Sequence, residues 1–262
     1  MSASTTAPVP ADVRLMNRAA TALFAVGIVS LLAAGGWWAV RHPLFAVAGI
    51  TVEGDVSHNS AATLRANVAS RLAGNFFTVN LAATREAFET APWVRRAVVR
   101  REFPNRLRVQ LQEHRAVALW GGDSDTRLVN NFGEVFEANI GDVEGDDLPR
   151  LAGPEAQSGE VLAMYRALTP LFEPLDLTVE RLALTARGSW EVDLDNGAVV
   201  ELGRGTTAEI TARTQRFVQT LNQVTSRYAR TPEALVSADL RHTDGSAVRL
   251  HGVGTTAEPV KK

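Results

Sequence analysis

The chain has 262 residues, no cysteine and a formal net charge of −2, with 45% hydrophobic and 21% charged residues. This balance is typical of a folded protein with room for one large domain or two small ones. The absence of cysteine excludes disulfides, zinc–thiolate sites, iron–sulfur clusters and thiol nucleophiles. All lysine is at positions 261 and 262, so chemistry that needs an internal lysine is excluded as well.

Residues 19–40 form a run of 22 residues without a charge. As a helix, this run is about 33 Å long, which is enough to cross a hydrocarbon layer of about 30 Å. Trp37 and Trp38 lie at its end, where aromatic side chains favour a membrane interface. Arg14 and Arg18 precede the run, and this small charge difference favours a cytoplasmic N-terminus with the large remainder exported.

Two other interpretations of the apolar run stay open. A cleaved signal peptide is favoured by Ala46-Val47-Ala48, which has the small-x-small form of a cleavage site. The run is longer than the usual apolar region of such a peptide and Arg41 follows it directly, so we favour a retained anchor. A buried core helix is the third interpretation, and its position at the front of the chain argues against it. The anchor and the signal peptide both export the residues beyond 43.

From residue 43 onward, the hydrophobic pattern predicts strands and helices in the order β-α-α-β-β. The predicted elements are a strand over 47–54, a helix over 60–72 carrying Leu64, Val68 and Leu72 and stopped at Gly74-Asn75, a helix capped by Asn80 that ends at Pro92, and strands over 93–103 and 106–113 joined by Pro104-Asn105. In the last strand Leu107, Val109 and Leu111 share one face, and arginine and glutamine occupy the other.

The second half of the chain predicts a mixture of short strands and two longer helices. The predicted elements are a hairpin at 128–129 and 133–136, a solvated acidic loop at 142–147, a linker at 148–154, a helix capped by Ser158 and terminated or kinked at Pro170, a strand over 179–186, a hairpin through Asp195-Asn196-Gly197, and strands over 235–241 and 247–250 around Asp244-Gly245. Thr206 and Glu209 have capping-box spacing ahead of a helix with an apolar face formed by Ile210, Phe217, Leu221, Val224 and Tyr228.

No catalytic or metal-binding constellation stands out. The histidines follow no metal-ligand spacing. The turn after Leu202, Gly203-Arg204-Gly205, lacks the lysine and spacing of a phosphate loop, so we interpret it as a strand-to-helix turn. Asp147 stands where a calcium loop starting at Asp142 needs glycine. We therefore predict no catalytic residue, no metal and no cofactor.

One charge cluster needs its own interpretation. Six arginines, at positions 95, 96, 100, 101, 106 and 108, fall within 14 residues. In a cytosolic protein this density would suggest nucleic acid, but no such target is expected outside the cytoplasm. The cluster is either the solvated face of a sheet or a docking surface for another protein.

Several short segments, taken together, resemble one known family. They are Pro43-Leu44-Phe45 with Val47, Ile50, Val52 and Gly54; Ala91-Pro92-Trp93-Val94; the run from Arg100 to Leu107 and Glu113-His114; Leu148-Pro149, Leu151 and Gly153-Pro154; Ser189-Trp190; Asn196-Gly197; Leu202-Gly203-Arg204; Arg216-Phe217-Val218; and Ala238-Asp239-Leu240-Arg241 with Gly245 and Ala247-Val248. Over residues 40–250 the chain resembles the FtsQ/DivIB family of bacterial cell-division proteins.

The resemblance implies an α+β protein with a single transmembrane helix, a POTRA domain and a mostly antiparallel β-domain with helices. The expected organisation is a cytoplasmic tail at 1–18, a transmembrane helix at 19–40, a POTRA domain at 43–114, a β-domain at 115–251 and a flexible tail at 252–262. It also implies a location in the bacterial inner membrane at the division septum, with the N-terminus cytoplasmic and the bulk periplasmic.

The function implied by the resemblance is a non-enzymatic divisome scaffold that links early and late division proteins. Its β-domain would bind the FtsB–FtsL pair by adding a partner segment to an edge strand. The partner-binding residues implied by position are Arg204, His242, Gly245, Ser246, Ala247, Val248 and Leu250, and a POTRA docking surface would include Arg96, Val99 and Arg101. Arg204 could pair with a partner carboxylate, and Gly245 would permit a tight turn.

The chain departs from the family pattern at His242, where tyrosine is usual, and near Leu250, where an aromatic residue is common. These departures imply a smaller aromatic contact area, and His242 could add a weak pH dependence. POTRA domains also serve outer-membrane assembly and secretion factors, which is the alternative function. That function needs a barrel of many strands of about ten residues, and too few strands are predicted after residue 115.

Overall fold

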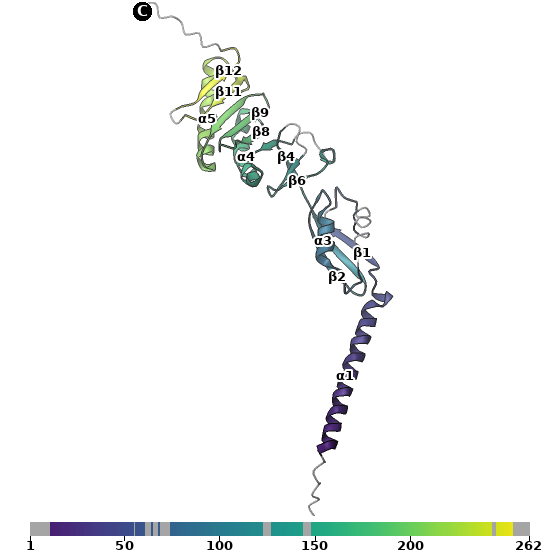
Figure 1. The fold of residues 1–262 in the computed structure, drawn as a ribbon. Coiled ribbons are helices and arrows are strands. Elements are labelled where there is room, and N and C mark those ends of the chain that lie inside the picture. Colours follow the sequence, from purple (N-terminus) through teal and green to yellow (C-terminus); the bar gives the residue numbers. More distant parts are fainter. Residues whose placement is uncertain are drawn as a thin grey trace, which may run out of the picture. The chain divides into compact units, whose positions relative to one another are not determined.

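A computed structural model describes residues 11–54, 56–60, 64, 68, 74–122, 127–143, 148–242 and 245–253. The chain divides into two compact units, with the boundary between Gln112 and Glu113. Each unit has a hydrophobic core of its own. The architecture is α+β, as the sequence predicts (Figure 1).

The first unit begins with the long helix α1 (Ala11–Arg41), followed by the short 3-10 helix η1 (Pro43–Phe45). The part of α1 from residue 11 to 38 is long and apolar enough to cross a membrane, and its most apolar 18 residues have a mean hydropathy of 2.0. The apolar side chains of this helix are exposed, Leu31 for example at 75%, so the interpretation as a buried core helix is wrong. The helix is longer than the apolar run because residues 11–18 contain no helix breaker.

The rest of the first unit is a small sheet covered by helix. Strands β1 (Gly49–Gly54), β2 (Val94–Glu102) and β3 (Arg106–Glu113) lie in the order β1-β3-β2, and β1 runs parallel to β3. Helix α3 (Leu81–Glu89) begins as predicted at Asn80, whose Oδ1 accepts hydrogen bonds from Ala82 N at 3.0 Å and Ala83 N at 3.1 Å. Helix α3 is the second helix of the predicted β-α-α-β-β order.

The core of this unit follows the predicted periodicity. Buried and exposed residues alternate without exception along β3, and Leu107, Val109 and Leu111 face inward. Leu64 and Val68 of the predicted first helix are helical and buried, while Leu72 and most of that helix lie outside the described residues. The connection from β2 to β3 contains the predicted turn residues Pro104 and Asn105, but it also includes Phe103, which the sequence predicts as part of the strand.

The second unit is one nine-stranded sheet with two helices. In spatial order its strands are β12 (Ala247–Leu250), β11 (Leu235–Asp239), β10 (Val199–Gly203), β9 (Trp190–Leu194), β8 (Val179–Leu184), β7 (Arg150–Ala152), β4 (Ala116–Trp120), β5 (Arg127–Asn130) and β6 (Val135–Glu137). The pairs β10–β11, β7–β8 and β4–β7 are parallel, and the other neighbours are antiparallel. The short 3-10 helices are η2 (Ile140–Asp142), η3 (Glu155–Gln157), η4 (Glu173–Leu175) and η5 (Pro232–Ala234).

Helices α4 (Ser158–Phe172) and α5 (Thr207–Arg227) pack against the sheet and against each other (Figure 1). Their apolar faces bury Val161, Leu168, Phe217 and Leu221 in the same core as the inward residues of the sheet. The opposite face of the sheet carries charged residues, and Arg181 there contacts Asp193 on the neighbouring strand at 3.0 Å. The arrangement leaves a helix-covered face and a polar face.

The predicted linker at 148–154 is wrong. Residues 150–152 form β7, which lies between β4 and β8 near the middle of the sheet, and Leu151 is completely buried. A strand of three residues is too short to show a period, and the prolines at 149 and 154 favour a loop in any local interpretation. Residues 150–152 therefore form a strand because they pair with β4 on one side and β8 on the other.

The predicted cap of α4 at Ser158 is wrong, and of the two outcomes predicted at Pro170, termination or a kink, termination is wrong. The residue that precedes α4 is Gln157, and Ser158 is already helical and donates from Oγ to the carbonyl of Gly133 at 2.6 Å. The helix does not terminate at Pro170 and continues to Phe172, which is completely buried. Packing of the last turn against the core outweighs the hydrogen bond that proline removes.

The capping box that begins α5 is confirmed. Thr206 N donates to Glu209 Oε2 at 2.8 Å, and Glu209 N donates to Thr206 Oγ1 at 3.4 Å. The predicted apolar face of α5 is buried as far as Leu221, but Tyr228 follows the end of the helix and is 55% exposed.

The hairpins at β5–β6 and β9–β10 are confirmed. Three other predicted segments lie outside the described residues: the acidic loop after Val143, the turn at 243–244 and the tail beyond 253.

Candidate partner-binding site

Strand β12 is the outermost strand at one end of the nine-stranded sheet. Among the described residues it pairs with β11 alone, in an antiparallel register that places Ala238 opposite Val248 and Asp239 opposite Ala247. An edge strand presents backbone N–H and C=O groups on its outer side. This edge can therefore accept a further strand.

The side chains of β12 divide between the two faces of the sheet. Leu250 is only 7% exposed and belongs to the core, and Val248 is half-buried against that core. Ala247 and Arg249 are exposed and line a hollow on the polar face together with Glu201 and Asp239. A strand added here would meet small and charged side chains on one face, while Leu250 would offer it only its backbone.

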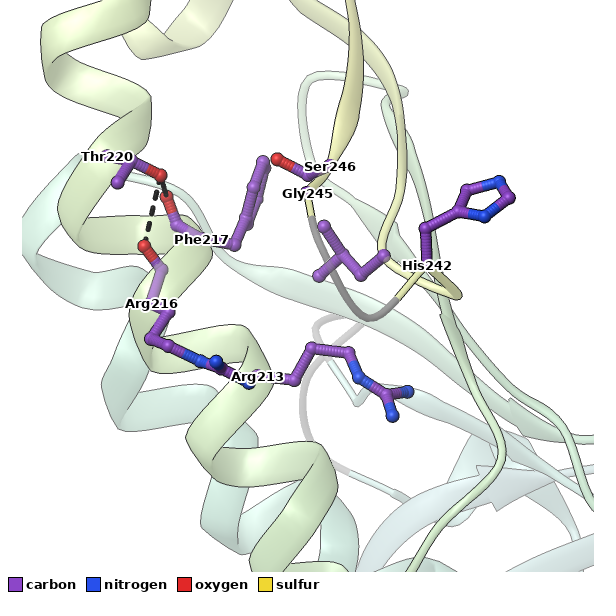
Figure 2. Close-up of a pocket in the computed structure, with 8 residues that line it drawn as sticks. Arg213, Arg216, Phe217, Thr220, His242, Gly245 and Ser246 are labelled. Atoms are coloured by element: carbon purple, nitrogen blue, oxygen red, sulfur yellow. Dashed lines mark hydrogen bonds between the residues drawn. The ribbon is translucent and has the colours of Figure 1, made fainter.

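A second hollow lies between α5 and the described residues around His242, Gly245 and Ser246 (Figure 2). Its volume is about 240 Å³, and it is lined by Arg213, Arg216, Phe217, Thr220, Leu240, His242, Gly245 and Ser246. Phe217 forms its apolar floor, and the His242 ring points outward, away from Phe217 (Figure 2). Thr220 is held by hydrogen bonds from its hydroxyl to the carbonyls of Arg216 and Phe217, both at 3.0 Å.

Arg213 connects this hollow to the turn that carries Arg204. Its guanidinium donates to the carbonyl of Leu202 and, at 3.4 Å, to that of Arg204. Arg213 also lines a larger and open hollow of about 810 Å³ that includes Arg204, Glu201 and Arg241. The exposed Arg204 therefore lies in a different hollow from His242, and Arg213 borders both.

Arg241 is fixed by two carboxylates on the polar face. Its Nη1 lies 2.8 Å from Glu201 Oε2, and its Nη2 and Nε donate to the two oxygens of Asp239 at 2.6 and 3.0 Å. Hydrogen bonds from the Arg241 side chain and backbone lower the pKa of Asp239 to about 2. The same partners raise the pKa of Arg241, so this pair is charged at every physiological pH.

These groups make a cationic end of the sheet beside an open edge. Arg204, Arg213 and Arg216 have no carboxylate among their hydrogen-bond acceptors in the described chain, whereas Arg241 has two. Backbone groups at the edge can bind an extended segment of any sequence, and the arginines can select acidic side chains. The arrangement therefore offers backbone pairing and positive charge at the same end of the sheet.

Leu250 belongs to the core, and the other six predicted partner-binding residues fall into three places. His242, Gly245 and Ser246 line the hollow against α5, Ala247 and Val248 line the hollow on the polar face, and Arg204 lies in the largest hollow. The turn that Gly245 is predicted to permit includes residues 243 and 244, which lie outside the described residues, so its role stays a prediction. A left-handed glycine is found instead at the end of β10, where Gly203 has φ +79°.

Sequence reasoning missed Arg213 and Arg241. Arg241 lies two residues after Asp239, and alternation along a strand would have placed both on one face. Arg213 has no such signal, because its acceptors are carbonyl groups of a turn that only the folding of α5 against β10 brings near.

The predicted POTRA docking residues also separate. Arg96 and Val99 line a hollow of about 400 Å³ between β2 and α3, together with Arg85 and Glu89. Arg101 instead donates to the carbonyls of Phe76, Phe77 and Val79, at 2.6, 3.3 and 2.8 Å. Its guanidinium is used within the unit to hold the loop before α3.

Nothing in the described part of the chain brings together three histidine, aspartate or glutamate residues that could hold a metal ion. The fold and the candidate site instead define a class: a protein with one apolar N-terminal helix, a small POTRA-type unit and a sheet unit whose open edge is suited to binding another chain. Comparison with known proteins identifies the family within that class.

Residues 45–114 match the family model described as POTRA domain, FtsQ-type, and residues 118–241 match Cell division protein FtsQ/DivIB, C-terminal. The chain is 43% identical over 243 residues to Cell division protein FtsQ of Burkholderia pseudomallei, covering 92% of this chain and 94% of that protein. It is 38% identical over 274 residues to the protein of the same name from Bordetella pertussis, covering 96% and 98%. The chain belongs to the FtsQ/DivIB family of cell-division proteins, which supports a role in the divisome.

Proposed function

We propose that this chain is a non-enzymatic scaffold of the divisome that binds the FtsB–FtsL pair through the outer edge of β12. In this proposal α1 anchors the chain in the inner membrane at the septum, and both folded units lie in the periplasm, where they link early and late division proteins. The open edge of β12 is the observation that carries the proposal.

The charges around the edge support an acidic partner segment. Arg204 and Arg249 are exposed and line two different hollows near the edge. Arg213 and Arg216 line the hollow between α5 and His242. Pairing of Arg204 with a carboxylate of the partner would add a charge-assisted hydrogen bond to the backbone pairing. His242, Gly245 and Ser246 would contact the partner where it passes the hollow, and Ala247 and Val248 where it pairs with the strand.

Disulfide cross-linking tests strand addition directly, because the native chain has no cysteine. Ala247→Cys on β12 is combined with single cysteines placed in turn along the partner segment, in cells that also express FtsL. If the segment adds as a strand, cross-links form at alternate positions, because successive side chains of a strand point to opposite faces. Glu137→Cys, exposed on β6 at the other edge of the same sheet, is the control. Equal cross-linking from both edges, or no alternation, contradicts the proposal.

Charge reversal tests the proposed role of Arg204. Arg204→Glu is expected to reduce co-purification of the FtsB–FtsL pair with the tagged full-length chain, without changing the circular dichroism spectrum. Arg115→Glu, another exposed arginine of the same unit, is the matched control. Unaltered capture by Arg204→Glu would refute the placement of the partner at this end of the sheet.

Fractionation tests the proposed location. The full-length chain is expected in the inner membrane with its partners. Recovery in the outer membrane, or a mature N-terminus at Gly49 after cleavage behind Ala48, would refute the anchored scaffold.

A further inference from the structure

The first unit carries an exposed apolar patch at the end where α1 leads into it. We call it the anchor-side patch, and its members are Pro43, Leu44, Phe77, Phe103 and Pro104. Leu44 is 70% exposed, Phe77 47% and Phe103 77%, and the patch contains no charged residue. Large apolar side chains that cluster on a surface commonly mark a site of contact with a partner or a membrane.

Three separate segments form the patch, and ring contacts and a backbone hydrogen bond join them. The ring centroids of Phe45 and Phe77 are 4.9 Å apart, and Phe76 N donates to the carbonyl of Phe45 at 2.8 Å. Phe76 in turn contacts Phe103, with 6.3 Å between ring centroids. Residues 43–45, 76–77 and 103–104 therefore belong to one surface, although they are distant in sequence.

The fold holds Phe77 outward. Asn75 Oδ1 accepts from Phe77 N and Thr78 N, both at 3.0 Å, so the loop before α3 is a closed turn. Arg101 fixes the same loop through the carbonyls on both sides of Phe77. Within this rigid loop Phe76 is 7% exposed and enters the unit, while its neighbour Phe77 is 47% exposed.

The patch is tied to the end of α1. Arg41 is the last residue of α1, Leu44 follows three residues later, and the Asn75 side chain donates to the carbonyl of Val40. Trp37 and Trp38 lie in the last turns of α1, with the Arg41 guanidinium 3.8 Å above the Trp37 ring. Aromatic and arginine side chains at the end of a spanning helix mark the level of the lipid headgroups.

We propose that the anchor-side patch lies in the interfacial layer of the membrane that α1 spans, so that the POTRA-type unit touches the lipid surface as well as being tethered to it. The occupant is the lipid itself, because the patch is apolar, uncharged and continuous with the interfacial end of α1. Leu44, Phe77 and Phe103 would lie among the headgroups and upper acyl chains, as the apolar side chains of interfacial proteins do.

Spin labelling of the full-length chain measures this contact. Asn105→Cys gives one label next to Phe103 and Pro104 without removing any member of the patch. The labelled chain is placed in vesicles of phosphatidylethanolamine and phosphatidylglycerol without any other protein. Collision with oxygen, which concentrates in lipid, is compared with collision with a water-soluble nickel chelate. Ser30→Cys in α1 and Glu86→Cys on α3 give the membrane and water references.

The label at residue 105 is expected to collide with the chelate several-fold less often than the label at Glu86. The double substitution Leu44→Ser and Phe103→Ser should raise chelate access toward the Glu86 value. The substitution Phe132→Ser, at a phenylalanine 54% exposed in the second unit, is the matched control and should leave it unchanged.

The following results would each contradict the proposal. Chelate access at residue 105 equal to that at residue 86 would mean that lipid does not cover the patch, leaving a protein partner as its occupant. Protection that survives loss of Leu44 and Phe103, or that Phe132→Ser removes equally, would mean that the patch is not its cause. The label at residue 30 reports insertion of α1 separately, and capture of a partner at β12 is measured independently of both.

Discussion

Asp239 and Arg241 show how single residues set the charge of the candidate site. Four hydrogen bonds and ion contacts fix Arg241 on the polar face, while Arg204 next to it keeps an exposed side chain. A guanidinium held by two carboxylates is a poor attractor for a third, whereas an exposed one is available to a partner. This difference is the reason that the proposed partner contact uses Arg204 and not Arg241.

Replacement of Asp239 by asparagine is expected to lower the stability of the second unit in a pH-dependent way. The folded pKa of about 2 lies below the ordinary value of 3.8, so the carboxylate stabilises the folded state above pH 3.8, and this contribution is lost as the pH falls toward 2. Because the pair is partly exposed, the loss at pH 7 is about 1 kcal/mol or less.

Thermal unfolding of the full-length chain followed at pH 7, 4 and 2.5 measures the difference between the native chain and Asp239→Asn. The difference should narrow on acidification through this range. Asp195→Asn, in the exposed turn between β9 and β10, controls for the loss of one carboxylate. A difference that stays constant with pH would show that the ion pair does not stabilise the fold.

At the scale of elements, the turn from β10 into α5 positions most of the cationic groups. Gly203 ends β10 with φ +79°, and a Cβ there would lie 3.0 Å from Arg241 Cγ and 3.2 Å from Arg213 Nη1. Glycine is therefore required twice, for its backbone conformation and for the close approach of two arginines. The capping box directly after it starts α5, which carries Arg213 and Phe217.

Gly203→Ala is expected to destabilise the chain more than Gly188→Ala. Gly188 has φ +77° in the turn between β8 and β9 and nothing within 4 Å, so alanine there costs only the left-handed conformation, about 1 kcal/mol. At Gly203 the methyl group also displaces Arg213 and Arg241, which adds about 1–2 kcal/mol. Chemical denaturation of both variants measures the two costs, and co-purification of the partner should fall for Gly203→Ala alone. Equal costs would mean that the arginines move aside freely.

At the scale of the whole molecule, the described residues form two cores, and each core buries a phenylalanine completely. Phe88 of α3 lies in the core of the first unit, and Phe172 of α4 lies in the core of the second. The two clusters share no residue. Separate cores are the usual condition for units that unfold in separate transitions.

The matched substitutions Phe88→Ala and Phe172→Ala should therefore each lower one thermal transition and leave the other in place. Truncation of a completely buried phenylalanine costs about 3–5 kcal/mol, which is large enough to shift a melting transition by many degrees. Scanning calorimetry of the full-length chain, with each variant compared to the native protein, resolves the two transitions. A single transition that moves with both variants would show that the units unfold together.

The sequence by itself determined the features that depend on neighbouring residues. The alternation along β3, the caps at Asn80 and Thr206, the hairpin at Asn196-Gly197 and the apolar run of α1 all follow from contacts over a few residues, and the structure contains each of them. The family motifs also indicated the order of the units, because they occur along the chain in that order.

Only the tertiary structure decided which segments meet. The burial of β7, the inward side chain of Leu250, the placing of Arg213 against the turn at Leu202, and the meeting of Phe77 with Phe45 all join residues that are distant in sequence or lack a local signal. Periodicity indicates which face of an element is apolar. It does not indicate which strand pairs with that element or which side chains pack against it. The open edge of β12 and the anchor-side patch are therefore properties of the packed chain.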